Sequence, residues 1–307
     1  MGAPTSAPLL PELQAHAPLG PLTTIRVGGA ADWLCRAGSF RDVVAALAWA
    51  RAREVPVAVI GRGSNLLVAD EGFRGLALRL VGRLTAISVR GADLWCGGGA
   101  SLPRAVQRAA AAGLEGLEWG ASIPGTAGGA VAMNAGAHSG ELAQSLRWAV
   151  LCGPEGRRRV GPVDLALGYR RSAVRPGEVV AAVGFALRSG DPEAIAQRLA
   201  SFRRHRRETQ PQGVRTFGSV FTNPPGDSAG RLLEAAGCKG LAAGGARFSP
   251  VHANFIEASP GCRAADVLDL MSEGRRRVRE AGGPELAPEV RYLDPRAGIV
   301  PAPVAGR

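Results

Sequence analysis

Three short segments, far apart in the chain, carry side chains that could work together in acid–base chemistry. Ser219 lies in TFGSVFTNP, Arg170 in GYRRS and Glu289 in LAPEVRYL. A hydroxyl group can donate a proton, a guanidinium holds a permanent charge that suits a carboxylate, and a buried carboxyl group can stay protonated. The three settings together predict one active site. Taken singly, the residues also fit a turn serine, a surface arginine and an exposed strand residue.

Two glycine-rich turns are candidates for holding a phosphate. GRGSNLL follows the apolar run Pro56–Ile60, and GGGA spans Gly97–Ala100. Backbone N–H groups that point outward from such turns can bind an anion. The first turn lacks the Lys-Ser/Thr of a P-loop, and Leu66 stands where a Rossmann fingerprint has its third glycine. One turn alone is weak evidence, but the second turn and the small-residue segment Gly113–Glu141 favour a flavin pyrophosphate site.

The elements that must position these segments are mixed helices and strands. Ser39 is a candidate N-cap with Asp42 three residues later, and apolar residues follow at helical spacing. The pattern predicts further helices over 102–112 and from about 191, and strands over 56–60, 76–80, 94–96, 148–152 and 179–187. We expect an α+β chain of two or three lobes, because 307 residues with 46% apolar content can build more than one core.

Composition limits the class of protein. The N-terminus has no basic region followed by an apolar one, and no stretch of eighteen apolar residues occurs, so we expect neither a signal peptide nor a membrane span. The five cysteines are odd in number, widely spaced and form no zinc-type cluster with the four histidines. This pattern predicts reduced thiols, no metal site and a cytoplasmic location.

The charge leaves two kinds of partner open. The formal net charge is +11, with arginine runs at 157–159, 203–207 and 275–277. Basic proteins can bind nucleic acid or small anionic substrates, and such runs can also be solvated helix faces. Aromatic residues make up only 5% of the chain, which is a poor supply of base-stacking side chains. We therefore do not expect a nucleic-acid partner.

The segments GRGSNLLVADEGFRG, GLEWGASIPGTAGGAVAMNAGA, GYRRS, FGSVFTNP, HANFI and PEVR occur in an order that resembles the UDP-N-acetylenolpyruvoylglucosamine reductase family. These are bacterial flavoenzymes of peptidoglycan precursor synthesis. The resemblance covers about Thr23–Leu293. No tyrosine lies between Tyr169 and Tyr292, so the chain looks like the shorter subtype, which lacks an inserted tyrosine loop.

The resemblance implies a domain plan. It predicts an FAD-binding domain of the PCMH type, which is vanillyl-alcohol-oxidase-like, at 21–189, with subdomains at about 21–83 and 84–189. A C-terminal α+β substrate-binding domain would follow at 190–295. Flexible tails are expected at 1–20 and 296–307.

The resemblance also implies a reaction and partners. NADPH would reduce noncovalently bound FAD, and the reduced flavin would pass a hydride to the enolpyruvyl group of UDP-N-acetylglucosamine enolpyruvate, which yields UDP-N-acetylmuramate. Arg170 and Glu289 would stabilise negative charge on the substrate carboxylate, and Ser219 would protonate the carbon that bears the ether oxygen.

Motif by motif, the resemblance implies further contacts. The implied cofactor-binding residues are Gly61, Arg62, Gly63, Ser64, Asn65, Leu66, Gly97, Gly98, Gly99, Ala100, Ser122, Ile123, Pro124, Gly125, Gly128, Gly129, Asn134, Ala135, Gly136, Ala137 and Arg291. The candidate substrate-binding residues are Tyr169, Arg206, Arg207, Arg215 and Asn223, of which the arginines could face the two phosphates of a UDP-sugar. His252 could contact a ligand or cap a turn.

Two other functions stay open at this level. An oxidase of the same flavin-binding fold would also carry glycine-rich turns. Such oxidases often attach FAD through a His or Cys in the first turn, where this chain has Arg62 and Ser64. An arginine-rich nucleic-acid-binding protein without catalysis is the second alternative.

Overall fold

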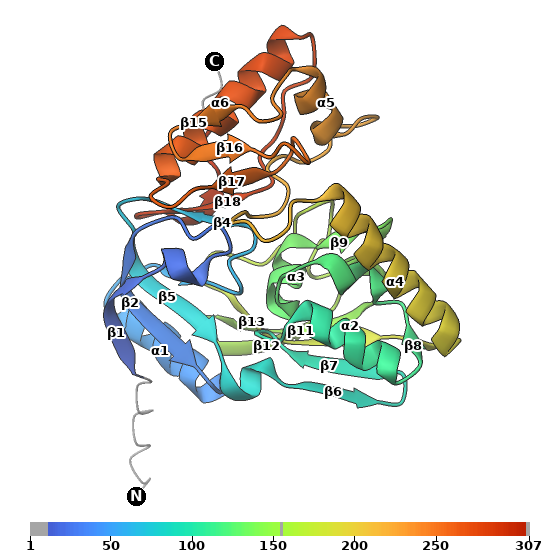
Figure 1. The fold of residues 1–307 in the computed structure, drawn as a ribbon. Coiled ribbons are helices and arrows are strands. Elements are labelled where there is room, and N and C mark those ends of the chain that lie inside the picture. The colour runs from blue at the N-terminus through green and yellow to red at the C-terminus, as the bar shows by residue number, and fades with distance from the viewer. Residues whose placement is uncertain (1–11, 154–155, 305–307) are drawn as a thin grey trace, which may run out of the picture.

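The computed structural model describes residues 12–153 and 156–304, which form three lobes (Figure 1). The first lobe is built on a sheet with the strand order β1-β2-β5-β3. Its elements are β1 (Leu13–Pro18), β2 (Ala30–Ala37), α1 (Phe40–Ala52), β3 (Val57–Val59) and β5 (Phe73–Leu80). Strands β2, β5 and β3 run parallel to one another, and β1 pairs antiparallel with β2. Helix α1 begins at the expected capping box, in which Ser39 and Asp42 bond each other's backbone N–H groups.

The second lobe is an antiparallel sheet with the order β12-β11-β13-β7-β6. Its strands are β6 (Ile87–Arg90), β7 (Asp93–Gly97), β11 (Leu146–Gly153), β12 (Gly156–Val160) and β13 (Val179–Ala186). Helices α2 (Leu102–Ala111) and α3 (Ala127–Met133) pack on it, and the small pairs β8 (Leu114–Glu115) with β14 (Arg188–Ser189) and β9 (Gly136–Ala137) with β10 (Gly140–Glu141) complete it.

The position of strand β13 between two cores explains why its sequence, VVAAVGFA, has no polar residues at alternate positions. Val179 and Ala181 belong to the same core cluster as α1 of the first lobe, whereas Val180 and Val183 pack in the core beneath α2 and α3. Because both faces of the strand are covered, apolar side chains occupy nearly every position. This strand is therefore the seam between the first two lobes.

The third lobe stands above the other two in Figure 1. It contains α5 (Ala229–Ala235), α6 (Ala264–Glu280) and a sheet of β15 (Ala242–Ala243), β16 (Ala246–Phe248) and β17 (Ile256–Ala258). Helix α4 (Pro192–Thr209), which we expected to open this lobe, instead packs on the second: Ile195 and Leu199 are buried in the core of α2. Arg198 ties α4 there through the carboxylates of Glu115 and Glu118, at 2.8 and 2.7 Å.

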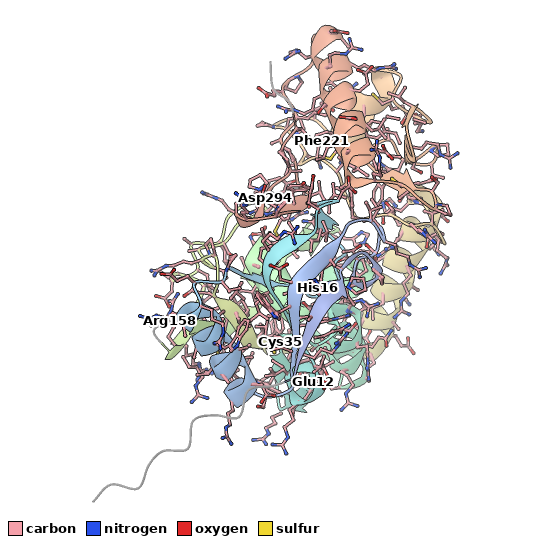
Figure 2. The ribbon with its side chains drawn as sticks, turned by 90° about the vertical axis from the view of Figure 1, so that its left-hand side faces the viewer. Glu12, His16, Cys35, Arg158, Phe221 and Asp294 are labelled. Atoms are coloured by element: carbon pink, nitrogen blue, oxygen red, sulfur yellow. The ribbon has the colours of Figure 1, made fainter. Side chains whose placement is uncertain are left out.

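The expected tails are wrong where the structure describes them. Residues 1–11 and 305–307 lie outside the described residues, but β1 pairs with β2, and β19 (Gly298–Pro301) pairs with β18 (Arg291–Asp294). Strand β18 also runs parallel to β4 (Leu66–Val68), which makes a sheet of the order β19-β18-β4. Figure 2 labels Asp294 at the end of this sheet, below the lobe that holds Phe221. Backbone pairing holds residues 13–18 and 298–301, although the Pro/Ala-rich sequence around them predicts no strands.

One contact ties the third lobe to the turn after β4. The carboxylate of Asp70 accepts hydrogen bonds from the first two N–H groups of α6, Ala264 at 2.7 Å and Ala265 at 3.1 Å. These groups have no partner within their own helix, so a carboxylate from another lobe serves as their cap. Together with β18, Asp70 fixes the third lobe on the first.

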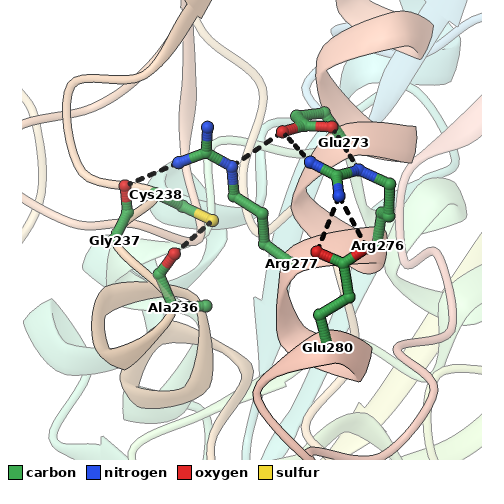
Figure 3. Close-up of polar contacts among 7 residues, drawn as sticks. All are labelled: Ala236, Gly237, Cys238, Glu273, Arg276, Arg277 and Glu280. Carbon is green, nitrogen blue, oxygen red and sulfur yellow. Dashed lines mark hydrogen bonds and ion pairs between the residues drawn. The ribbon is translucent and has the colours of Figure 1, made fainter.

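Two members of the arginine run at 275–277, Arg276 and Arg277, bond other residues of the third lobe (Figure 3). Arg276 pairs with Glu273 and Glu280 on α6, and Arg277 donates to Glu273 at 2.7 Å and to the Gly237 carbonyl at 3.3 Å. Hydrogen bonds from Arg276 and Arg277 lower the pKa of Glu273 to about 2. This segment therefore fits the interpretation as a helix face with its own counter-charges.

In the described ranges 12–153 and 156–304, no helix has the length and apolar character needed to cross a membrane.

Candidate functional site

The segment of Ser219 lies beside the segment of Glu289 at the base of the third lobe. The Glu289 and Val290 N–H groups donate to the Val220 carbonyl at 2.9 and 3.3 Å, and Phe221 bridges to Pro288 in antiparallel fashion. The Asn254 side chain adds two hydrogen bonds to the Phe221 backbone, at 2.8 and 2.9 Å. Ser219 is half-buried, and its hydroxyl makes no hydrogen bond to the described part of the protein. The hydroxyl is thus held in place by its backbone and is free to face a ligand.

Arg170 reaches the same place from the second lobe. It stands in a tight turn whose ends, Gly168 and Arg171, bond each other in both directions at 3.1 Å, and its own φ is +56°. A left-handed φ is strained for a residue with a side chain, so the surrounding contacts must hold this conformation. The Arg170 Nε donates to Glu289 Oε1 at 2.8 Å, and its NH2 group donates to the Gly136 carbonyl at 2.8 Å.

The structure therefore brings the three predicted catalytic residues together. Arg170 and Glu289 touch directly, and Ser219 lies one residue from the Val220 carbonyl that holds Glu289. The two charged side chains are mostly buried, with 20% of Arg170 and 17% of Glu289 exposed. A guanidinium in contact with a carboxyl group, next to the backbone of a serine whose hydroxyl makes no described hydrogen bond, suits the stabilisation and protonation of an anion.

Burial raises the pKa of the Glu289 carboxyl group above its ordinary value, and Arg170 opposes that shift. The raised pKa means that burial disfavours the carboxylate more than the guanidinium favours it. A protonated Glu289 could donate a hydrogen bond to a ligand carboxylate, which an ionised one could not.

This shift predicts a pH dependence of stability. Between the unfolded pKa of a glutamate, about 4.3, and its raised folded value, the folded state binds more protons, so the unfolding free energy falls as pH rises. Urea unfolding from pH 4.5 to 7.5 should show that Glu289→Gln lacks this contribution, so that its stability relative to wild type increases with pH. Glu71→Gln, at an exposed position on the turn after β4, is the matched control. Parallel curves for wild type and Glu289→Gln would contradict the raised pKa.

A cavity of about 330 Å³ lies between the first and second lobes. Both glycine-rich turns and the start of α3 line it, with Gly61, Arg62, Gly98, Gly99, Gly128 and Gly129 among the predicted residues. Glycine is required where these segments meet. A Cβ on Gly61 would lie 2.8 Å from the Thr126 hydroxyl, and one on Gly98 would lie 1.8 Å from the Val180 carbonyl oxygen.

The first turn, whose Gly61 and Arg62 line this cavity, has backbone donors that are unpaired within the described chain. From Gly61 to Asn65, no backbone N–H donates a hydrogen bond to any residue that the structure describes. Unpaired backbone N–H groups need a partner, and a run of them around a positive-φ glycine, here Gly63, forms a concave anion site. The donor set therefore fits the pyrophosphate of a dinucleotide cofactor. Apolar residues such as Ile60, Leu80 and Val180 line the same cavity and suit a flat aromatic ring.

Other predicted cofactor residues connect the first turn to the catalytic residues. The Ser64 carbonyl accepts from Gly218 N–H at 3.1 Å. The Asn65 side chain donates to the Glu289 carbonyl at 3.1 Å, and the Asn65 carbonyl accepts from Arg291 N–H at 3.1 Å. Leu66 is buried in β4 opposite Arg291. The first turn thus connects the cavity to Ser219 and Glu289.

The remaining predicted cofactor residues lie in the second lobe, where several have structural tasks. Gly97 and Ala100 close the second turn by a backbone hydrogen bond, and the Gly125 carbonyl accepts from Leu102. Ser122 Oγ lies 3.4 Å from His138 Nε2, and Ile123 packs on the core of the second lobe. The rest of this group, which surrounds these segments, is Pro124, Ala135, Gly136 and Ala137.

Asn134 supports the Arg170 turn. It is fully buried, with a left-handed φ of +39°. Its Nδ2 donates to the Gly168 carbonyl, and its Oδ1 accepts from Ala143 N–H, both at 3.1 Å. Both polar atoms of the carboxamide are therefore engaged by the protein. Asn134 positions Arg170 and does not line the cavity.

The candidate substrate-binding residues differ in whether their side chains are free to contact a ligand. Burial lowers the pKa of the Arg206 and Arg291 guanidinium groups, and neither has a carboxylate partner in the described chain. Arg207 is exposed and Arg215 half-buried. Tyr169 is 53% exposed, with the Arg170 guanidinium 4.9 Å from its ring centre. The Asn223 Oδ1 accepts from Ala229 N–H at 3.0 Å, and His252 Nδ1 accepts from Asn254 N–H at 3.1 Å, so these two side chains hold local turns.

Several residues that line the cavity are absent from the sequence-based prediction. They include Arg36, Arg79, Thr85, Ser101 and Glu178. Arg36 and Arg79 each stand next to the last residue of a parallel strand, and the carboxyl ends of parallel strands are a common place for ligands. That signal would have required the strand order, which the sequence pattern does not provide.

Comparison with known proteins agrees with this arrangement. Residues 31–158 match the profile of an FAD binding domain, and residues 210–293 match that of the C-terminal domain of UDP-N-acetylenolpyruvoylglucosamine reductase. The enzyme of that name from Anaeromyxobacter dehalogenans (strain 2CP-C) is 46% identical over 277 residues, which cover 90% of this chain and 84% of that protein. The one from Acidiphilium cryptum is 44% identical over 301 residues, 95% of this chain and 97% of its own.

A solved structure extends the similarity to the fold. The crystal structure of UDP-N-acetylenolpyruvylglucosamine reductase from Thermus caldophilus matches with a TM-score of 0.79 and 39% identity, over 92% of this chain and 98% of that one. The expected α+β fold, with an FAD-binding part and a C-terminal domain, is confirmed. By sequence, domain content and fold, this chain belongs to the UDP-N-acetylenolpyruvoylglucosamine reductase family.

Proposed function

We propose that this protein reduces UDP-N-acetylglucosamine enolpyruvate to UDP-N-acetylmuramate, with FAD as its cofactor and NADPH as the hydride source. When bound, FAD would supply the hydride-transfer chemistry between NADPH and the vinyl carbon of the substrate. The observation that carries the proposal is the contact of Arg170 with Glu289 beside Ser219, at the junction of the cavity and the third lobe.

The chain's own residues would act on the substrate carboxylate and on the carbon next to it. Arg170 holds a permanent positive charge that stabilises negative charge spreading into that carboxylate. A protonated Glu289 donates a hydrogen bond to the same group. The Ser219 hydroxyl then gives its proton to the carbon that bears the ether oxygen. Addition of one hydride and one proton saturates the double bond, and the serine is reprotonated from solvent.

The first two lobes would hold the cofactor through unpaired N–H groups of residues 61–65 and the apolar cavity wall. We assign Arg206, Arg207, Arg215 and Arg291 as candidate counter-charges for the substrate phosphates and the cofactor, and Tyr169 and Asn223 as candidate substrate contacts. A cytoplasmic location is part of the proposal, because both the UDP-sugar and NADPH are drawn from cytoplasmic nucleotide pools.

An anaerobic half-reaction tests the function. The purified protein, reduced with NADPH, should recover its yellow flavin colour when UDP-N-acetylglucosamine enolpyruvate is added, and the product should be two mass units heavier than the substrate. UDP-N-acetylglucosamine, which lacks the enolpyruvyl group, should have no effect. Reduced flavin that ignores the enolpyruvyl substrate but reoxidises rapidly in air would instead indicate an oxidase.

A further inference from the structure

Three arginines gather at one edge of the first-lobe sheet. Arg36 is the second-to-last residue of β2 and Arg79 the second-to-last of β5, and these parallel strands place them directly opposite each other in register. Arg62 follows β3, the strand on the other side of β5. All three line the cavity between the lobes. They therefore stand at the carboxyl ends of three neighbouring parallel strands.

No acid balances this group. Within residues 12–153 and 156–304, none of the three guanidinium groups forms an ion pair, and the one hydrogen bond among them joins Arg36 to the neutral amide of Gln14 at 2.9 Å. Glu178 also lines the cavity, but its carboxylate accepts from Arg158 at 2.7 Å and from the Arg175 N–H at 2.9 Å. The acid that lines this cavity is thus already engaged by other donors.

Three unbalanced cations have a cost in the absence of a ligand. Like charges directly opposite each other on neighbouring strands destabilise a sheet. Burial, together with the positive charges of Arg36 and Arg62, lowers the pKa of the Arg79 guanidinium. Guanidinium groups match phosphate in charge and in hydrogen-bond geometry. A cluster of this kind that lines a ligand cavity therefore indicates an anionic ligand.

We propose that Arg36, Arg62 and Arg79 supply the counter-charge for the diphosphate of FAD, beside the unpaired N–H groups of residues 61–65. This inference rests on the proposed FAD-dependent function and adds Arg36 and Arg79 to its binding residues. The cluster would make the protein select flavins by their phosphates: FAD has two, FMN one and riboflavin none.

The test measures flavin binding to the full chain after its flavin has been removed, by the change in flavin fluorescence. Arg79→Met should raise the Kd for FAD by about 10- to 100-fold, as expected for the loss of a charge-assisted hydrogen bond, and should leave the Kd for riboflavin unchanged. Added salt should weaken FAD binding less in the variant than in wild type. Arg36→Met should act in the same direction. Arg74→Met, on the same strand but exposed and paired with Asp32, is the matched control.

Thermal unfolding separates this role from a packing defect. Without flavin, Arg79→Met should be at least as stable as wild type, because it removes a repulsion. With FAD, its rise in Tm should be smaller. Arg79→Lys, which keeps the charge, should retain most of the FAD affinity.

Three results would overturn the inference: unchanged FAD affinity in Arg79→Met, equal losses for FAD and riboflavin, or a higher KM for NADPH with FAD affinity intact. The last would assign the arginines to the phosphates of the nicotinamide dinucleotide. Wild-type protein that binds no flavin would instead refute the proposed function itself.

Discussion

Ser219→Ala should slow the return of flavin colour with the enolpyruvyl substrate by about 10²- to 10⁴-fold, the usual contribution of a positioned general acid. Reduction by NADPH should keep its wild-type rate, because the Ser219 hydroxyl has no part in that step. The expectation follows from a hydroxyl that no described group of the protein engages, on a backbone fixed by Val220 and Asn254. Anaerobic stopped-flow absorbance measures the two half-reactions separately.

Two further variants sharpen this result. Ser219→Cys keeps a proton donor at the position and should recover part of the rate that alanine loses. Ser259→Ala removes a serine of the same lobe whose hydroxyl donates to the Gly245 carbonyl at 3.0 Å on an exposed turn, and it should behave as wild type. A wild-type rate in Ser219→Ala would remove this residue from the mechanism.

Arg170→Met should slow the same step by about 10²- to 10³-fold, the typical cost of losing one group that stabilises a developing anion. Arg170 also opposes the rise in the Glu289 pKa that burial causes, so the loss of Arg170 should raise the pKa of that carboxyl group further. The high-pH limb of the pH–rate profile, where Glu289 loses its proton, should therefore move to higher pH. Single-turnover rates measured across pH report both effects.

The neighbouring arginine provides the control for Arg170. Arg171 is exposed, and the turn needs only its backbone groups, so Arg171→Met should stay close to wild type. Arg170→Lys keeps the charge but loses the planar fork that reaches both Glu289 and the Gly136 carbonyl, so it should recover only part of the rate. Equal losses at Arg170 and Arg171 would indicate damage to the turn and not loss of a catalytic charge.

Local chemistry made parts of this molecule predictable from sequence. The Ser39 capping box and the buried strand at 179–186 depend on neighbouring residues, and both were found where the pattern places them. The joining of Ser219, Arg170 and Glu289 depends on contacts between three lobes. No spacing in the chain encodes those contacts, and only the resemblance to a family brought the three residues into one prediction.

The features that the sequence did not predict also depend on contacts between residues far apart in the chain. The segment LQAHAP lies in the Pro/Ala-rich stretch that was expected to be a tail, yet it becomes β1 because β2 offers it an edge to pair with. Asn134 looks like part of a ligand loop, but the fold engages both ends of its amide: Nδ2 donates to Gly168 in the Arg170 turn, and Oδ1 accepts from Ala143 N–H. Arg36 and Arg79 are 43 positions apart in the numbering and meet only through the register of β2 and β5. Long-range pairing decided each case.

The pairing of β18 with β4 has a consequence for how this protein is made. Leu66 leaves the ribosome long before Arg291, its partner in the sheet, and at roughly 5–20 residues per second the wait is on the order of tens of seconds. During that interval the edge of β4 has no neighbour to cover it, and an uncovered edge strand invites pairing with other chains. Nascent chains are therefore most prone to aggregate before synthesis ends, and truncation before residue 291 would remove a strand from the sheet that includes β4.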